Sequence, residues 1–163
     1  MKRFLAVLNT IVVMLVSTGC LAAGETLLER QIAAAKAGDS EAQYDIAYRY
    51  EKGRGVEQDE EIALSWFRKA AEKGLDKAQY KLGMFYLDGI GVDPNPAKAQ
   101  TWLGKAAVQG YPPAQYQLGK FYAANDHRDY ERALNWLEKA RTNGYEPATS
   151  EIRKIRKLST AAK

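Results

Sequence analysis

Few side chains in this sequence could support catalysis or metal binding. His127 is the single histidine, and it lies beside Asp126 and close to Asp129. Acid–base catalysis and metal binding need several such groups brought together, whereas one imidazole in a polar stretch is more typical of a solvated loop. We therefore expect no catalytic residues, no metal site and no cofactor, with a metal or acid–base role for His127 as the alternative.

Two glycine-containing stretches and one acidic run complete the candidates for chemistry. The letters "GRGV" at 53–56 and "GIGV" at 89–92 follow no predicted strand, so we interpret them as connectors between helices and not as phosphate-binding loops. Acidic residues at 59–61 fall at a predicted helix start, where carboxylates interact favourably with the helix dipole. No nucleophile lies in a pattern that suggests a partner base.

The first 22 residues are typical of a secretory signal peptide. Lys2 and Arg3 precede a mostly apolar run at 4–16, which is shorter than the roughly 20 residues that span a membrane. The alternative is a buried N-terminal helix. The signal predicts a periplasmic protein, free or on the periplasmic face of a membrane, or a secreted one.

The position of cleavage stays open between two alternatives. The residues at 17–20 resemble the processing box of lipoproteins, in which Cys20 would be lipidated and would tether the protein to a membrane. Ser17, however, occupies a position that is normally apolar. Ordinary cleavage after Ala22 or Ala23 would instead remove the only cysteine of the chain, which in either case excludes an internal disulfide framework.

The charge distribution argues against a nucleic-acid partner. The formal net charge is +4, but residues 23–144 carry 17 basic and 18 acidic side chains. Residues 145–163 carry five basic and two acidic side chains, so the excess lies in the tail and the signal. Nucleic-acid binding needs a basic stripe on the folded body. We expect no nucleic acid, and a membrane only through Cys20.

The body of the chain is an internal repeat, because several residue types recur together about every 36 residues. The positions in register are Gly38, Gly74, Gly110 and Gly144; Ala42, Ala78, Ala114 and Ala148; Tyr44, Tyr80 and Tyr116; and Trp66, Trp102 and Trp136. Within each unit, apolar residues at intervals of three and four predict two helices, and Gly89, Asn95 and Pro96 punctuate them in the second unit.

This pattern predicts an all-α protein built of helix pairs, with about eight helices and no strands. The expected segments are a signal peptide at 1–22, a capping helix at 25–38, repeats at 39–74, 75–110 and 111–144, and a capping helix with a basic tail at 145–163. Gly83 and Gly119 fall inside predicted helices, which favours a close helix crossing there. We expect the three tryptophans to fill the space between the two helices of a unit.

The stretches "AQYDIAYRYEKGRGV" and "AQYKLGMFYLDGIGV", each followed by an aromatic residue and "KAA", resemble Sel-one-like repeats of the tetratricopeptide-like superfamily. Ile46 and Ala47 stand where the family has Leu-Gly, and the third unit keeps "AQYQLGKFY" but loses the glycine loop. The resemblance implies a right-handed α-solenoid, a superhelix of antiparallel helix pairs, with interaction or scaffold roles. Cysteine-rich relatives have been linked to β-lactam hydrolysis, but this chain lacks their cysteine pairs.

The resemblance also implies that the first helices of successive units line a concave face. The residues that we expect to contact a protein or peptide partner there are Tyr44, Tyr48, Tyr80, Met84, Tyr116, Lys120, Asp45 and Lys81, with Gln117 in the same row as the last two. Tyrosine provides contact area with a polar tip. The alternative for Tyr44, Tyr80 and Tyr116 is half-buried packing, since they belong to the repeat pattern itself.

We therefore expect an exported bacterial interaction module or scaffold of the cell envelope, without enzymatic activity. Two alternatives stay open. One is an enzyme or enzyme inhibitor of envelope metabolism, and the other is a secreted effector-type factor. An enzyme would need a polar cluster in the repeat groove, and these residues do not supply an obvious one.

Overall fold

The protein is an array of helices and its structure, a computed structural model, describes residues 26–124 and 129–161. Within these ranges there are eight helices and no strands, which confirms the predicted fold class. The helices are α2 (Leu27–Ala37), α3 (Ser40–Lys52), α4 (Glu60–Glu72), α5 (Asp76–Asp88), α6 (Pro96–Val108), α7 (Pro112–Ala124), α8 (Tyr130–Thr142) and α9 (Pro147–Ala161).

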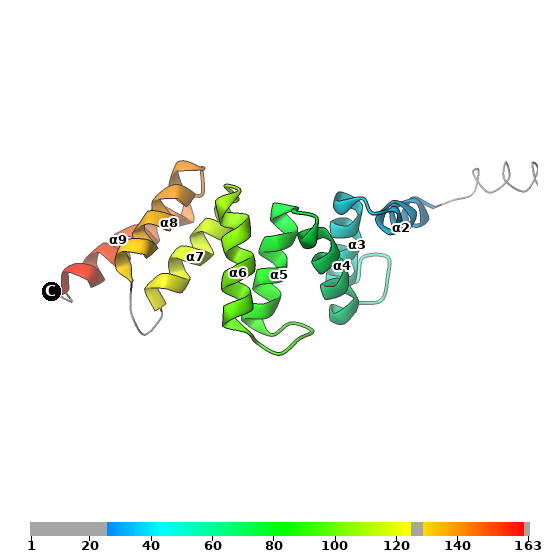
Figure 1. Cartoon of the computed structure of the whole chain (residues 1–163), viewed down its shortest axis with the longest axis horizontal. Coiled ribbons are helices and arrows are strands. Elements are labelled where there is room, and N and C mark those ends of the chain that lie inside the picture. The colour runs from blue at the N-terminus through cyan, green and yellow to red at the C-terminus, as the bar shows by residue number, and fades with distance from the viewer. Residues whose placement is uncertain (1–25, 125–128, 162–163) are drawn as a thin grey trace, which may run out of the picture.

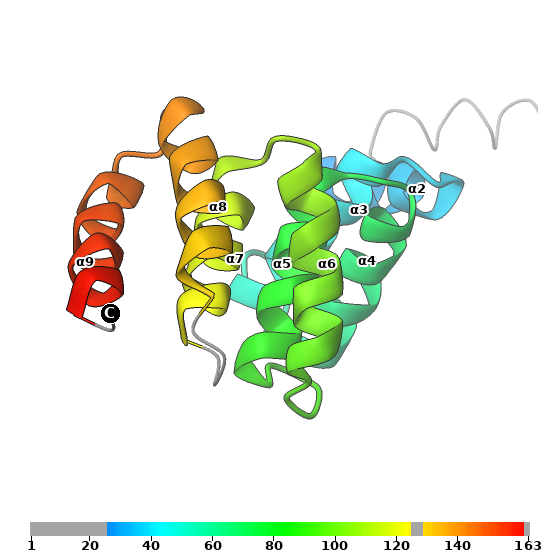
Figure 2. The same ribbon diagram turned by 60° about the vertical axis from the view of Figure 1, so that its left-hand side comes forward.

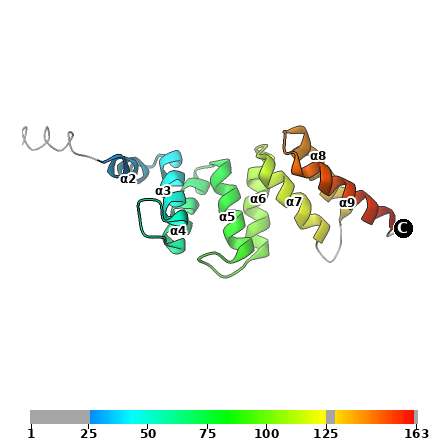
Figure 3. The same cartoon turned by 180° about the vertical axis from the view of Figure 1, so that it is seen from behind.

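Consecutive helices pack against each other in an open array, with α2 and α9 at opposite ends (Figure 1). The first helices of the units, α3, α5 and α7, lie toward one side, and the second helices, α4, α6 and α8, lie toward the other (Figures 2 and 3). By its place in the alternation, α2 corresponds to the second helix of a unit, and α9 corresponds to the first helix of a unit.

The helix ends follow the capping residues that the sequence predicts. The side-chain oxygen of Asn95 accepts a hydrogen bond from the backbone N–H of Lys98 at 2.9 Å, and Pro96 occupies the first turn of α6. Asp59 caps α4 in the same way through the N–H of Ile62 at 2.8 Å. Such caps stabilise a helix by satisfying backbone donors that have no partner within it.

The two mid-helix glycines mark close helix crossings, as predicted. A Cβ atom added to Gly83 would lie 2.8 Å from Cγ of Leu103, and one added to Gly119 would lie 2.7 Å from Cγ of Leu137. Leu103 and Leu137 are fully buried and belong to the second helix of the same unit. Each glycine therefore allows the two helices of its unit to approach closely.

The prediction for the tryptophans is wrong in its details. On the second helices, the large side chains that are fully buried are Phe67, Leu103 and Leu137, each one residue beyond a tryptophan. The tryptophans themselves are only partly buried. Each carries a lysine of the next helical turn over its ring, at 4.0 to 4.2 Å from the ring centre, in the pairs Trp66–Lys69, Trp102–Lys105 and Trp136–Lys139. A one-residue shift around the helix moves these rings from the interior to its margin.

Buried glutamines tie each first helix to the second helix before it. The side-chain amides of Gln43, Gln79 and Gln115 donate to backbone carbonyls eight residues earlier, at the ends of α2, α4 and α6, over 3.0 to 3.1 Å. Each carbonyl also accepts the backbone N–H of the repeat glycine three residues later, so the glutamine adds a second hydrogen bond to it across the boundary between units.

Two of these glutamines also accept a hydrogen bond from the end of the second helix of their own unit. Oε1 of Gln79 accepts from the amide of Gln109 at 2.7 Å, and Oε1 of Gln115 accepts from the amide of Asn143 at 2.9 Å. The corresponding residue in the first unit is Lys73, and within the described residues the buried Oε1 of Gln43 has no hydrogen-bond partner. The first unit therefore lacks the side-chain amide hydrogen bond that the second and third units have.

Candidate functional site

The eight residues predicted to bind a partner all lie on the solvent side of α3, α5 and α7, and none of them is buried. We call this surface the first-helix face. It results from helical periodicity, because alanine, glutamine and leucine positions point into the array and the positions between them do not. Their exposure permits contact with a partner, while the contact itself stays a prediction.

The three tyrosines of the repeat pattern are half-buried and pack against neighbouring rings. The ring centres lie 5.4 Å apart for Tyr44 and Phe67, 5.4 Å for Tyr80 and Tyr111, and 5.1 Å for Tyr116 and Tyr145. Such aromatic pairs stabilise packing beyond the area that they bury. This geometry favours a packing role for Tyr44, Tyr80 and Tyr116, with only their outer edges available to a partner.

Burial extends the pH range in which these phenols are neutral. It raises the pKa of Tyr44 to about 12, and it raises the pKa of Tyr80, Tyr111 and Tyr116 above the ordinary value. The hydroxyl groups therefore remain uncharged donors and acceptors to a higher pH than those of exposed tyrosines.

The N-terminal half of the first-helix face balances its own charges. Nζ of Lys81 lies 2.9 Å from both carboxylate oxygens of Glu51, and the two side chains are only 23% and 12% exposed. Lys77 pairs with Glu41 and also lies 4.4 Å from the ring centre of Tyr44. Lys81 and Lys77 are therefore already occupied by partners on α3.

A hollow of about 220 Å³ lies at this N-terminal end, and two of the predicted residues line it. Its walls are Gln31, Asp45, Tyr48, Arg49 and Arg54. The guanidinium of Arg54 lies 5.1 Å from the ring centre of Tyr48, and Arg49 donates to Oε1 of Gln31 at 3.0 Å. The hollow combines an aromatic ring with charges of both signs, which suits a polar side chain.

A second hollow of about 300 Å³ lies between α5 and α7 and is mainly apolar. Its walls are Leu87, Gln117, Lys120, Phe121 and Ala124. Its volume is at the lower limit for small-molecule pockets, and it has room for one or two side chains of a peptide. Lys120 stands at its edge, with Nζ 5.5 Å from the ring centre of Tyr116. Together the hollows can hold side chains, and neither contains a nucleophile beside a base.

No group of residues in the described part of the chain has the composition and geometry of a metal site. None of the helices in residues 26–124 and 129–161 is long and apolar enough to cross a membrane. His127 and Asp126 lie outside the described residues, as do Cys20 and the whole predicted signal peptide.

Sequence reasoning missed several residues that shape this surface. Tyr111 and Tyr145 pack against the pattern tyrosines of their neighbouring helices, and both directly follow a repeat glycine. That recurrence was a signal, although Leu75 replaces the tyrosine in the first unit. Leu87 and Phe121 face the apolar hollow from helix positions that the sequence alone does not distinguish from core positions.

The three helix pairs correspond to matches with a known family model. The model described as Sel1 repeat matches residues 40–75, 76–111 and 112–145. The chain belongs to the Sel1 repeat family. Sel1 repeat proteins are generally protein-interaction modules and are typically non-catalytic scaffolds.

Solved structures of other Sel1 repeat proteins are similar to this chain. A Sel1 repeat protein from Oxalobacter formigenes is 38% identical with a TM-score of 0.69, over 78% of this chain and 97% of that chain. The protective antigen c5321 of uropathogenic Escherichia coli strains, which displays an SLR fold, is 36% identical with a TM-score of 0.69. That match covers 74% of this chain and 26% of the antigen, so this chain spans about a quarter of its length. A comparison with curated proteins finds no match.

Proposed function

We propose that this Sel1 repeat protein is an exported bacterial interaction module that binds a protein or peptide partner on its first-helix face. The observation that carries the proposal is the row formed by Tyr48, Met84 and Lys120. These residues occupy the same position in α3, α5 and α7, all are accessible, and they differ from unit to unit. Residues that pack in the same way in every unit tend to be of one type. A position occupied by a different residue type in each unit is therefore better suited to recognising a partner.

The two hollows support this assignment. Tyr48 lines the polar hollow and Lys120 lines the apolar one, so the row connects the two. An extended peptide that lies across the first helices could place a polar side chain in one and an apolar side chain in the other.

Cross-linking in envelope fractions, followed by recovery of the protein, tests this proposal. The test variant carries Tyr48→Ala, Met84→Ala and Lys120→Ala together. The matched control carries Ser65→Ala, Thr101→Ala and Asn135→Ala, three exposed residues that share one position on the second helices. We expect the test variant to lose the partner and the control to keep it, provided that both retain the helical circular dichroism of the parent. Equal recovery by both variants would count against the first-helix face.

Export is the second part of the proposal. The charged start and short apolar run of residues 1–22 support it, and so does the likeness to a protein described as a protective antigen. Cell fractionation and mass spectrometry of the mature N-terminus test it. An acylated chain that begins at Cys20 would indicate a membrane tether, whereas an unmodified chain that begins after Ala22 or Ala23 would indicate a free protein. An uncleaved protein in the cytoplasm would refute export.

A further inference from the structure

The helix α9 exposes a surface whose counterpart in α5 and α7 is covered by the second helix of the unit. In α5 and α7, Gly83 and Gly119 receive the second helix of their own unit through Leu103 and Leu137. When the units are aligned on their alanines, the corresponding residue of α9 is Arg153, and it is exposed. Because the crossing helix leaves room at this position only for glycine in α5 and α7 and for Ala47 in α3, a side chain as long as arginine prevents another helix from docking in the same geometry.

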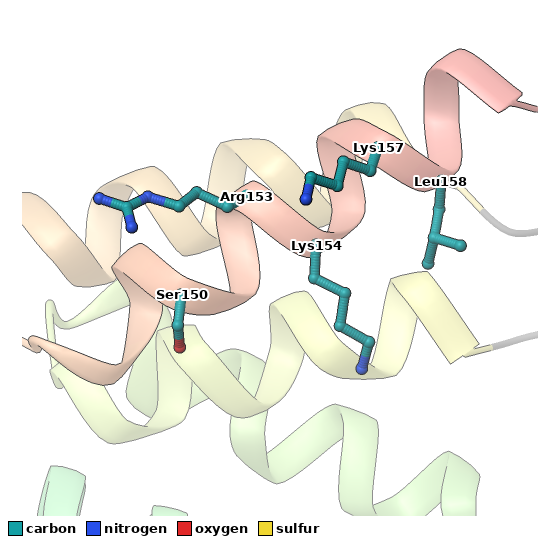
Figure 4. A pocket seen from close by; sticks show the side chains of 5 residues that line it. All are labelled: Ser150, Arg153, Lys154, Lys157 and Leu158. Atoms are coloured by element: carbon teal, nitrogen blue, oxygen red, sulfur yellow. The ribbon is translucent and has the colours of Figure 1, made fainter.

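A hollow of about 410 Å³ lies along this part of α9. Five residues of α9 line it, spaced over two helical turns: Ser150, Arg153, Lys154, Lys157 and Leu158 (Figure 4). Their spacing of three and four residues places them on one side of the helix. The side is strongly basic and contains one apolar side chain, Leu158, which is 44% exposed.

The charges on α9 divide into paired and unpaired groups. Arg156 donates to Glu138 of α8 at 2.9 Å, and Lys154 lies 3.3 Å from Glu151. Within the described residues, Arg153 and Lys157 make no ion pair with a carboxylate. The hollow therefore presents two free cations and a third that is shared with one acidic neighbour.

We propose that this hollow of α9 binds an acidic peptide segment of a partner protein, in which carboxylates flank one apolar side chain. The carboxylates contact Arg153 and Lys157, and the apolar side chain packs on Leu158. A guanidinium and an ammonium suit this role, because both donate strong hydrogen bonds to carboxylate oxygens. This surface is separate from the row formed by Tyr48, Met84 and Lys120, so the inference does not depend on the proposed function.

Other anionic partners fit the surface less well. Lipid-binding basic clusters contain about four to eight Lys or Arg, and two of the four on α9 are paired with carboxylates. Amphipathic helices that insert into membranes expose a broad apolar face. Here Ile152 and Ile155 are buried against α8, which leaves Leu158 alone. A protein on duplex DNA contacts about six to ten phosphates, which is more than the free cations of α9 could neutralise.

An amide chemical-shift titration of the purified exported protein tests the inference. The probe is a capped peptide of sequence Ser-Glu-Glu-Leu-Asp-Ser, and the control peptide replaces its acids by the corresponding amides. The test variant is Arg153→Gln with Lys157→Gln. The charge-matched control is Lys36→Gln with Lys98→Gln, two exposed lysines on α2 and α6. All four positions are on the surface, so both variants should keep the parent's helical circular dichroism.

We expect the acidic peptide to shift the amides of α9, with an affinity that falls at least tenfold in the test variant and as salt is raised. The charge-matched control should bind like the parent protein. The inference is wrong if millimolar peptide produces no saturable shift, if both variants bind alike, or if the amide peptide binds equally well. It is also wrong if phosphatidylglycerol vesicles shift the amides of α9 and the acidic peptide does not.

Discussion

Two glycines inside helices should respond in opposite ways to the same substitution. Gly104 lies within α6 and Gly119 within α7, and alanine is favoured over glycine in a helix by about 1 kcal/mol. A Cβ atom on Gly104 would meet no atom of the described residues within 4 Å. We therefore expect Gly104→Ala to raise the free energy of unfolding by about 1 kcal/mol.

At Gly119 the gain in helix propensity is opposed by a steric clash. The added Cβ would lie 2.7 Å from Cγ of Leu137 and 3.0 Å from the backbone oxygen of Ala133. Leu137 is fully buried and the oxygen belongs to the backbone, so neither moves away easily. Overpacking of this kind costs about 1–3 kcal/mol. We expect Gly119→Ala to lower the free energy of unfolding by up to about 2 kcal/mol once the propensity gain is included.

Urea denaturation followed by far-ultraviolet circular dichroism measures both effects. The two variants should differ by about 1–3 kcal/mol, which corresponds to several degrees in Tm for a chain of this size. If Gly119→Ala stabilised the protein as much as Gly104→Ala does, the close crossing of α7 and α8 would be refuted, and with it the reason for glycine at that position.

Three further substitutions or conditions test other parts of the structure. Lys73→Gln should supply the missing donor to Gln43 and raise the free energy of unfolding by about 1 kcal/mol; no change in a urea titration would argue against this side-chain amide hydrogen bond. Stability should be full below pH 10 and fall between pH 10 and pH 12, because the unfolded state ionises at the ordinary pKa of 10.0 while burial raises the pKa of Tyr44 to about 12. Tyrosinate absorbance follows this titration, and Tyr44→Phe should weaken the loss. Asn95→Ala removes the cap on Lys98 and should lower stability by about 1 kcal/mol in thermal denaturation.

The periodicity of apolar residues, together with caps and glycines, was sufficient to predict the helices and their order. Caps and glycines can be recognised in a sequence because they act on residues close to them in the chain. Asn95 and Asp59 could be read as helix starts since their hydrogen bonds reach only three residues along the chain. The tryptophans were misplaced for a related reason. Positions 66 and 67 differ by one step around the helix, and only the packed partner helix decides which of the two side chains is buried.

For the candidate surface, the sequence could predict which residues are exposed on each helix, but not which residues of different helices contact each other. Exposure of Tyr48 and Lys120 follows from the helical stripe, but the pairing of Lys81 with Glu51 joins residues 30 positions apart on different helices. The hollow of α9 was beyond sequence reasoning, because the helical pattern does not show how the side chains of Arg153, Lys154 and Lys157 are arranged around it. The basic tail was visible in the sequence, but its separation into paired and unpaired charges was not.

The missing hydrogen bond to Oε1 of Gln43 also indicates where local unfolding of the array should begin. In a linear array, stability is a sum of nearest-neighbour couplings, and the first unit lacks the side-chain amide link that joins the first helix to the end of the second helix in the next two units. Opening should therefore begin in the first unit, between α3 and the end of α4, giving a gradient of hydrogen exchange that rises toward the N-terminal end. Since Tyr48 and Arg49 of α3 line the polar hollow, that hollow should adapt its shape to a partner, whereas the apolar hollow between α5 and α7 should stay fixed.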